Sequence, residues 1–196
     1  ISVKTDEFSY EMLLVRYVSV NKEHMYPDGL VPVDENTRIP LKKGIRQPVY
    51  ICFYADNTVK PGKHRVEMLV DNAIKTHIDI YVFDFSLPDT PSCITSFGLG
   101  RKYIKKLHGE NTDEMYAKYY EFLLKHKISA YEIPCNILSD DADKYLSDPR
   151  MTSFVIPYSN DDEIITMYYN KLRRNKDWLS KGFFYPLDEP TCTDHY

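Results

Sequence analysis

The chain has 196 residues, a formal net charge of −4 and 43% hydrophobic residues, with 17 tyrosines among them. This hydrophobic content supports packed cores and excludes general disorder. The acidic balance without a basic run excludes a nucleic-acid footprint, and no apolar stretch approaches the roughly 20 residues of a membrane-spanning helix.

Residues 1–88 carry the alternation of apolar side chains that is typical of β-strands. Strands are predicted near residues 8–20, 47–54, 66–70 and 76–85. Tyr26-Pro27-Asp28-Gly29 has the composition of a turn, because proline fixes one dihedral angle and glycine accepts a positive φ. This spacing predicts an antiparallel β-sandwich that serves as an accessory domain. Two prolines within Leu87–Pro91 place its end at residue 88.

Residues 89–196 alternate short strands with helical periods. Strands are predicted at 92–99, 129–134, 152–158 and from 183 onward. Helices are predicted from Asn111 to about Lys127, around 140–148, and from Asn160 to about Lys181, with both asparagines as capping residues. Gly182 is expected to end the last helix, and Arg101–His108 to form a basic loop. The resulting β-α-β-α-β-α-β order requires parallel strands with right-handed crossovers.

Two architectures fit this order: a doubly wound open sheet, or the first four strands of a (β/α)8 (TIM) barrel. A dinucleotide-binding fold requires the GxGxxG pattern, but Gly98-Leu99-Gly100 is followed by Arg101-Lys102-Tyr103. Acidic residues after the fourth strand favour the barrel, whose chemistry lies at the carboxyl ends of the strands. A whole barrel takes about 250 residues. We therefore expect this chain to be a segment of a longer protein, in agreement with a start at Ile1 that lacks a signal-like region.

Asp188 and Glu189 follow the aromatic stretch Phe183–Tyr185 and precede Pro190, which stops the strand. Retaining glycosidases normally place two carboxyl groups on either side of the sugar, about 5–5.5 Å apart. Adjacent carboxylates are ill placed for that geometry, and better placed for cleavage in which the sugar's own 2-acetamido group is the nucleophile. The same Asp-Glu-Pro sequence also suits a plain surface turn.

Other side chains after the predicted strands are candidates for substrate binding. These are Arg101 after the first strand, Asn136 after the second, and Tyr158 and Asn160 after the third. Each also suits a structural role as a cap, turn or edge residue. The four cysteines form no CxxC unit, so we expect neither a metal nor another cofactor.

Four stretches of the chain resemble glycoside hydrolase family 123, the β-N-acetylgalactosaminidase-like enzymes, and uncharacterised families with the same domain layout. They are Tyr26–Pro32 (YPDGLVP), Phe83–Pro91 (FDFSLPDTP), Tyr119–Ile128 (YYEFLLKHKI) and Phe184–Pro190 (FYPLDEP). The resemblance implies substrate-assisted, retaining cleavage of a β-linked 2-acetamido sugar such as N-acetylgalactosamine. In it Glu189 is the general acid/base, and Asp188 holds the acetamido nitrogen. It also implies a secreted or periplasmic protein, although these residues alone do not determine the compartment.

Two alternatives remain open from the sequence. A barrel glycosidase of another specificity would use Glu189 as the acid and a nucleophile from an absent strand. A carbohydrate- or protein-binding module would have no activity. The partner expected under the leading interpretation is an oligosaccharide or glycoconjugate. We expect the 196 residues alone to be inactive, and further residues or another chain to cover the open barrel edge.

Overall fold

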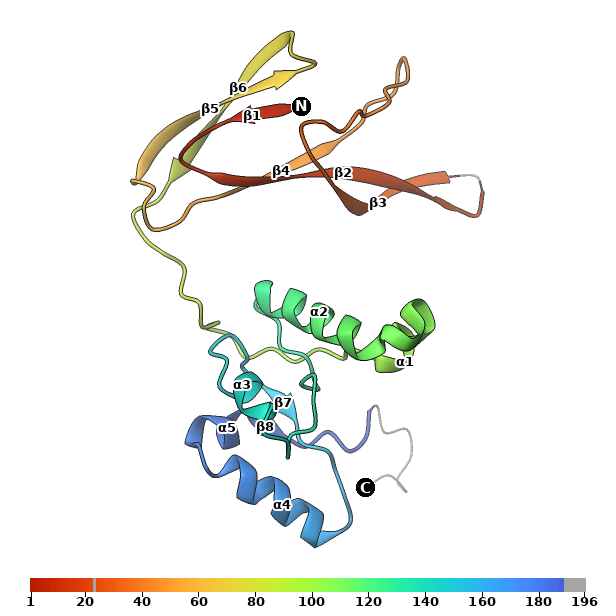
Figure 1. Ribbon diagram of the computed structural model, residues 1–196, viewed down its shortest axis with the longest axis vertical. Coiled ribbons are helices and arrows are strands. Elements are labelled where there is room, and N and C mark those ends of the chain that lie inside the picture. The colour runs from red at the N-terminus through yellow and green to blue at the C-terminus, as the bar shows by residue number, and fades with distance from the viewer. Residues whose placement is uncertain (23, 189–196) are drawn as a thin grey trace. The chain divides into compact units, whose positions relative to one another are not determined.

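The computed structural model describes residues 1–22 and 24–188. The chain divides into two compact units, one from Ile1 to Ser86 and one that begins at Leu87. The sequence predicts the boundary after residue 88, within the same proline-containing linker. Each unit has its own hydrophobic core. The first unit consists of strands, and all of the helices labelled in Figure 1 belong to the second.

The first unit contains two three-stranded antiparallel sheets, ordered β1-β5-β6 and β3-β2-β4. Their strands are β1 (Ser2–Lys4), β2 (Ser9–Val20), β3 (His24–Val33), β4 (Val49–Tyr54), β5 (Gly62–Val70) and β6 (Ile74–Val82). A small core joins the two sheets, because Val3 of β1, Met12 of β2 and Val66 of β5 are buried in one cluster with Phe8.

The turn predicted at Tyr26–Gly29 is wrong, because these residues lie inside β3. The chain reverses earlier, at Asn21 and Lys22, which both have positive φ angles (57° and 61°). The register between β2 and β3 shifts after Val15, so that two residues of β3, Asp28 and Gly29, lie opposite Arg16 alone. The proline–glycine composition therefore serves a β-bulge in an edge strand, where a missing N–H is tolerated.

Four short extended segments of the second unit lie side by side in chain order. Phe97 forms a parallel bridge with Ala130, and the Val155 N–H donates to the Tyr131 carbonyl oxygen at 2.7 Å. β7 (Phe154–Val155) pairs in parallel with β8 (Gly182–Phe183). Regular pairing covers far fewer residues than the predicted strands at 92–99, 129–134 and 152–158.

Three hydroxyl side chains tie the first three segments together near their amino ends. The Thr95 N–H donates to Thr152 Oγ1 at 3.0 Å, the Ser129 N–H to Thr95 Oγ1 at 2.9 Å, and the Thr152 N–H to Ser129 Oγ at 2.8 Å. Ser129 Oγ and Thr152 Oγ1 are also hydrogen-bonded, at 3.0 Å. We call Thr95, Ser129 and Thr152 the hydroxyl cluster. Its cyclic bonding satisfies backbone groups at positions where the sheet ladder is too short to do so.

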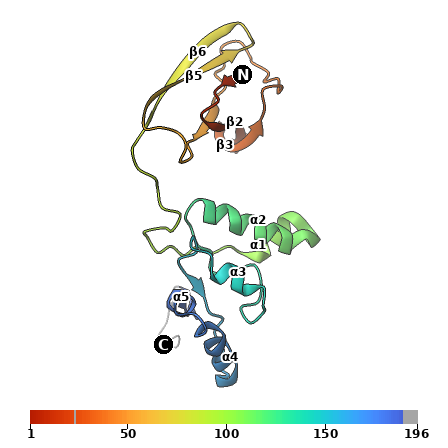
Figure 2. The same ribbon diagram turned by 60° about the vertical axis from the view of Figure 1, so that its left-hand side comes forward.

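The helices of the second unit are α1 (Arg101–His108), α2 (Thr112–Lys125), α3 (Ala142–Leu146), α4 (Asp162–Leu172) and α5 (Lys176–Lys181), with a 3₁₀ turn, η1, at Gly109–Asn111. The basic loop predicted at Arg101–His108 is wrong, because these residues form α1, which buries Ile104. α1 and α2 lie next to each other (Figures 1 and 2). η1 runs directly into α2, so Asn111 makes no side-chain cap.

The last predicted helix is two helices with a different cap. Asp161, not Asn160, caps α4, because its Oδ1 accepts the Glu163 N–H at 2.8 Å. α4 ends at Leu172, and Asn175 caps α5. Gly182 does not take the predicted left-handed conformation, since its φ is −79° and its ψ is 137°. Glycine is needed for space instead, because a Cβ here would lie 2.8 Å from Ile156 Cδ1.

The core of the second unit brings together α2, β7 and the C-terminal helices. Its buried members include Tyr116, Tyr120 and Leu124 of α2, Phe154 of β7 and Leu172 of α4. Lys171 is also buried, and its Nζ bonds to Asp143 Oδ1 at 2.5 Å and to the Ser139 carbonyl oxygen at 3.0 Å. This charged pair links α4 to the segment that contains α3.

Candidate functional site at the carboxyl ends of the parallel segments

The residues that follow the four parallel segments meet at one edge, because adjacent parallel strands point the same way. This edge is formed by the stretches 98–101, 131–134, 156–160 and 184–188. The structure describes five of the predicted site residues. Four of them lie in these stretches: Arg101, Tyr158, Asn160 and Asp188. The fifth, Asn136, lies two residues beyond the second stretch. Glu189, the predicted acid/base, lies outside the described residues.

Asp188 is exposed and is held by a tyrosine from its own stretch. Tyr185 donates its hydroxyl to Asp188 Oδ1 at 2.5 Å, and this hydrogen bond raises the pKa of Tyr185 to about 12. The Tyr185 ring lies 5.3 Å from the ring of Tyr131, at the carboxyl end of the second segment. Tyr131 also meets Phe183 of β8 edge to face, at 6.4 Å. Asp188 is thus connected through Tyr185 and Tyr131 to the neighbouring segments.

Tyr158 and Asn160 form a pair at the end of the third segment. The Tyr158 hydroxyl donates to Asn160 Oδ1 at 2.8 Å, so the amide oxygen of Asn160 orients a tyrosine rather than capping α4. The Tyr158 ring is 60% exposed and lies edge to face with Phe184, at 6.4 Å. The third stretch and the fourth, which also holds Asp188, therefore present exposed aromatic surface.

Arg101 and Asn136 are occupied by structural contacts. The Arg101 guanidinium donates to Asp113 Oδ1 at 2.6 Å and to the Pro134 carbonyl oxygen at 3.2 Å, and it lies 4.0 Å above the ring of Tyr116. Arg101 thus fastens α1 to α2 and to the second stretch. The Asn136 side chain accepts the Leu138 N–H at 2.9 Å within a turn. Substrate binding by either residue stays a prediction.

Sequence reasoning did not single out Tyr131 or Tyr185 as site residues. Both lie within predicted strands, at 129–134 and from 183 onward, so their position gave no separate signal of a site. Tyrosine is common in ordinary strands, and this chain has 17 of them.

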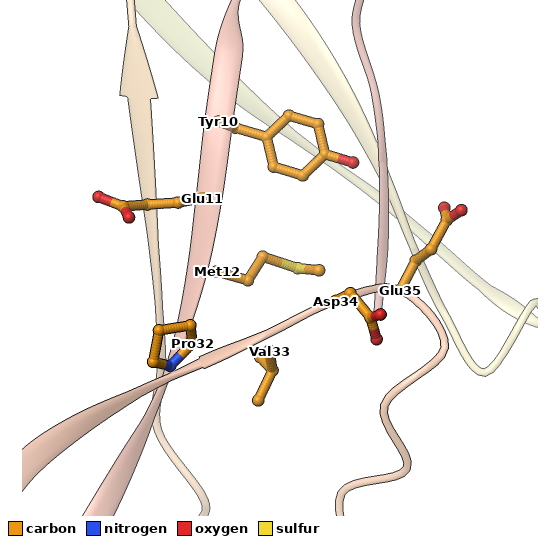
Figure 3. A pocket seen from close by; sticks show the side chains of 7 residues that line it. All are labelled: Tyr10, Glu11, Met12, Pro32, Val33, Asp34 and Glu35. Atoms are coloured by element: carbon orange, nitrogen blue, oxygen red, sulfur yellow. The ribbon is translucent and has the colours of Figure 1, made fainter.

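Two hollows lie elsewhere on the described residues. One, of about 370 Å³, is in the first unit and is lined by Tyr10, Glu11, Met12, Pro32, Val33, Asp34 and Glu35. Tyr10 and Met12 extend toward Asp34 and Glu35, whereas Glu11 points the other way (Figure 3). Asp34 is already bonded to Thr37 Oγ1 at 2.6 Å, which lowers its pKa. The carboxylate of Glu11 accepts the hydroxyl of Tyr54.

The second hollow, of about 380 Å³, lies at the opposite ends of the parallel segments. Its lining comes from 94–96, 152–153 and 180–183 and includes two members of the hydroxyl cluster, Thr95 and Thr152. In a barrel this amino-terminal face serves stability, whereas catalytic residues lie at the carboxyl face. Neither hollow is lined by any of the predicted site residues.

Within residues 1–22 and 24–188, no three His, Cys, Asp or Glu side chains are grouped so that they could hold a metal ion. None of the helices in this part of the chain is long and apolar enough to cross a membrane. Searches of protein-family models, of curated proteins and of solved structures returned no match for the chain.

Proposed function

We propose that the protein to which this chain belongs is a glycoside hydrolase that cleaves a β-linked 2-acetamido sugar with retention, using the acetamido group as the nucleophile. The observation that carries the proposal is the position of Asp188. This carboxylate follows the fourth of four parallel segments and accepts a hydrogen bond from Tyr185, whose ring lies next to that of Tyr131. The resemblance to glycoside hydrolase family 123 supplies the reaction type.

The order of the segments supports the first half of a (β/α)8 barrel. Each parallel segment pairs with the one before it in the chain, through Phe97, Tyr131, Val155 and Phe183. A barrel adds each strand beside the previous one, whereas a doubly wound sheet reverses direction after its first strands. The proposal therefore places the chemistry at the edge that holds Asp188.

The reaction assigns one role to each of the two carboxyl groups. The acetamido carbonyl oxygen attacks the anomeric carbon while the bond to the leaving oxygen breaks, and Glu189 gives its proton to that oxygen. Asp188 accepts a hydrogen bond from the acetamido N–H, which favours the charge that develops on this group. Water then attacks the anomeric carbon, returns a proton to Glu189 and restores the acetamido group.

Tyr185 acts as a positioning residue in this scheme. An ionised carboxylate has two oxygens with about four acceptor sites. The Tyr185 hydroxyl occupies one site on Oδ1 and leaves the other oxygen for the substrate N–H. The exposed rings of Tyr158 and Phe184 offer apolar surface on which the carbon-bound hydrogens of a sugar ring pack.

The proposal is tested on the full-length protein with 4-nitrophenyl N-acetyl-β-galactosaminide and a thiazoline analogue of the same sugar. We expect hydrolysis with retention and competitive inhibition by the thiazoline. Glu189→Gln is expected to lower kcat by about 10²–10⁴-fold, the usual contribution of a general acid. Asp188→Asn is expected to lower kcat and to weaken thiazoline binding. The matched control is Glu35→Gln, an exposed carboxyl of the first unit.

Each other result has a definite meaning. Hydrolysis that is indifferent to the thiazoline would favour a glycosidase with a nucleophile on another strand. A large fall in the unfolding temperature of Glu189→Gln would identify a structural carboxyl. Absence of hydrolysis of any β-linked 2-acetamido sugar by the full-length protein would refute the proposal.

A further inference from the structure

His64 of β5 is a half-buried histidine whose two ring nitrogens each face an oxygen atom. Its Nδ1 lies 2.9 Å from Glu7 Oε2, and its Nε2 lies 2.7 Å from the carbonyl oxygen of Lys60. The ring also meets the buried ring of Phe8 edge to face, at 5.4 Å. His64 therefore joins two loops of the first unit. Glu7 and Phe8 belong to the loop between β1 and β2, and Lys60 belongs to the loop between β4 and β5.

The chemistry of the two oxygen partners fixes the number of protons on the ring. A carbonyl oxygen and an ionised carboxylate accept hydrogen bonds and donate none. A neutral imidazole has one N–H, whereas the imidazolium has two. The two contacts of His64 therefore fit the imidazolium, which donates to Glu7 and to Lys60 at once. The pKa of His64 is accordingly raised above its ordinary value of 6.5, first by the hydrogen bond to Glu7 and then by that to the Lys60 carbonyl oxygen.

The charge that acts on the His64 ring comes from Glu7. Ile80, an apolar residue, lies opposite His64 on β6. The charged neighbours of His64 along β5 are Lys63 and Arg65. Because side chains alternate along a strand, both point to the other face, where they form salt bridges with an aspartate of β6. Titration of the ring therefore acts first on its contact with Glu7.

Loss of one ring proton removes one of the two hydrogen bonds. The Lys60 oxygen is fixed in the backbone, whereas the Glu7 side chain is 59% exposed and can turn to water. The neutral ring therefore keeps its N–H on Lys60 and releases Glu7. This release loosens the loop that follows β1. The remaining ties of β1 are its three-residue pairing with β5 and the burial of Val3 in the core of the first unit.

We propose that His64 is a pH-sensitive clasp that holds the amino-terminal strand β1 on the edge of β5. The clasp is closed while the ring carries two protons, and it opens as the pH rises and Glu7 is released. A histidine whose pKa is raised by folding stabilises the fold in full below the unfolded-state pKa, and this stabilisation is lost as the pH rises through the folded-state pKa. β1 lies at the edge of the sheet β1-β5-β6. Its detachment leaves the edge of β5 open to pairing with another strand.

The test is an NMR titration of the whole 196-residue chain between pH 5.5 and 8.5. The ring nitrogens of His64 report its protonation. Hydrogen exchange of the amides in 2–4 and 67–69, corrected for the intrinsic pH dependence of exchange, reports the pairing of β1 with β5. We expect a ring midpoint above 6.5, and protection of these amides that falls with the same midpoint. The clasp belongs to the first unit and does not depend on the proposed catalysis at Asp188.

Two variants test the contact itself. Glu7→Gln is expected to lower the ring midpoint and to reduce the fall in protection, because the charged acceptor is gone. Asp6→Asn is the matched control, since it removes the neighbouring exposed carboxyl and the same charge. His64→Gln has no titrating ring, so protection of the β1–β5 amides is expected to be independent of pH.

A shared midpoint above 6.5 that Glu7→Gln lowers and Asp6→Asn leaves in place would support the proposal. Any of four results would overturn it: a ring midpoint at or below 6.5, protection that stays constant through the ring titration, equal changes in Asp6→Asn and Glu7→Gln, or a fall in protection in His64→Gln as large as in the parent. The last result would assign the pH dependence to another group.

Discussion

Replacing Thr152 by valine tests whether the hydroxyl cluster holds the parallel segments in register. Valine keeps the branched shape of threonine but removes Oγ1. The Thr95 N–H then loses its acceptor at 3.0 Å, and Ser129 Oγ loses a partner at 3.0 Å. Ser129 is fully buried, so water cannot readily replace the lost bond. A buried polar group left unsatisfied costs about 1–3 kcal/mol, and we expect Thr152→Val to destabilise the second unit by about 2 kcal/mol.

The single tryptophan of the chain makes the measurement specific to the second unit. Trp178 is 7% exposed in that unit's core, and its Nε1 donates to Ser147 Oγ at 3.1 Å. Its fluorescence during urea unfolding therefore reports on the second unit alone. For a urea m-value of about 1–3 kcal/mol/M, the loss shifts the midpoint by about 1 M.

Thr166→Val is the matched control, because Thr166 lies exposed on α4 and the same hydroxyl is removed. An exposed substitution of this kind usually changes stability by less than about 0.5 kcal/mol. Equal midpoints for Thr152→Val and Thr166→Val would refute the role assigned to the cluster. Additive effects of Ser129→Ala and Thr152→Val would also count against it, because bonded partners are expected to couple.

Three further predictions concern close packing, the small core and a histidine. Gly182→Ala is expected to destabilise the second unit by about 1–3 kcal/mol in urea unfolding, because the new Cβ would meet Ile156 Cδ1 at 2.8 Å; an unchanged midpoint would show that this neighbour yields freely. Met12→Ala is expected to cost about 2–5 kcal/mol in the first unit, seen by circular dichroism, while the tryptophan transition stays unchanged; a shift of both signals would mean that the units unfold together. The pKa of His64 is raised, first by its hydrogen bond to Glu7, so its stabilising effect is present below pH 6.5 and is lost as the pH rises through the raised value. Melting at pH 5.5 and 8.5 is expected to differ less in Glu7→Gln than in the parent, and equal differences would contradict this.

Local sequence patterns predicted elements better than their ends. The continuous apolar run at residues 47–54 and the alternation at 66–70 mark β4 and β5, because both patterns arise within one strand whatever its partner is. The Pro-Asp-Gly stretch in β3 suits both a turn and a bulge, so its composition alone could not distinguish them. The pairing of β3 with β2 on both sides of this stretch makes it a bulge. α1 was mistaken for a loop because its exposed lysines outnumber its one buried residue, Ile104.

The candidate site was only partly accessible from the sequence. Asp188 was predicted from its place after a strand, which needs no knowledge of distant contacts. Its partners Tyr185 and Tyr131 were not predicted, because the contact between their rings depends on which segments are neighbours. Arg101 was predicted as a substrate ligand, yet the structure shows its guanidinium held by Asp113 and the Pro134 carbonyl oxygen.

The sequence by itself determined the change from alternating strands to strand–helix units near residue 88, and the acidic end of the aromatic stretch Phe183–Asp188. These features follow from local periodicity and composition. Only the tertiary structure decided that Asp188 meets Tyr185 and that Gly182 lies too close to Ile156 and Phe154 to hold a side chain. Such contacts join side chains according to strand register and packing, and neither is encoded in any one short stretch of residues.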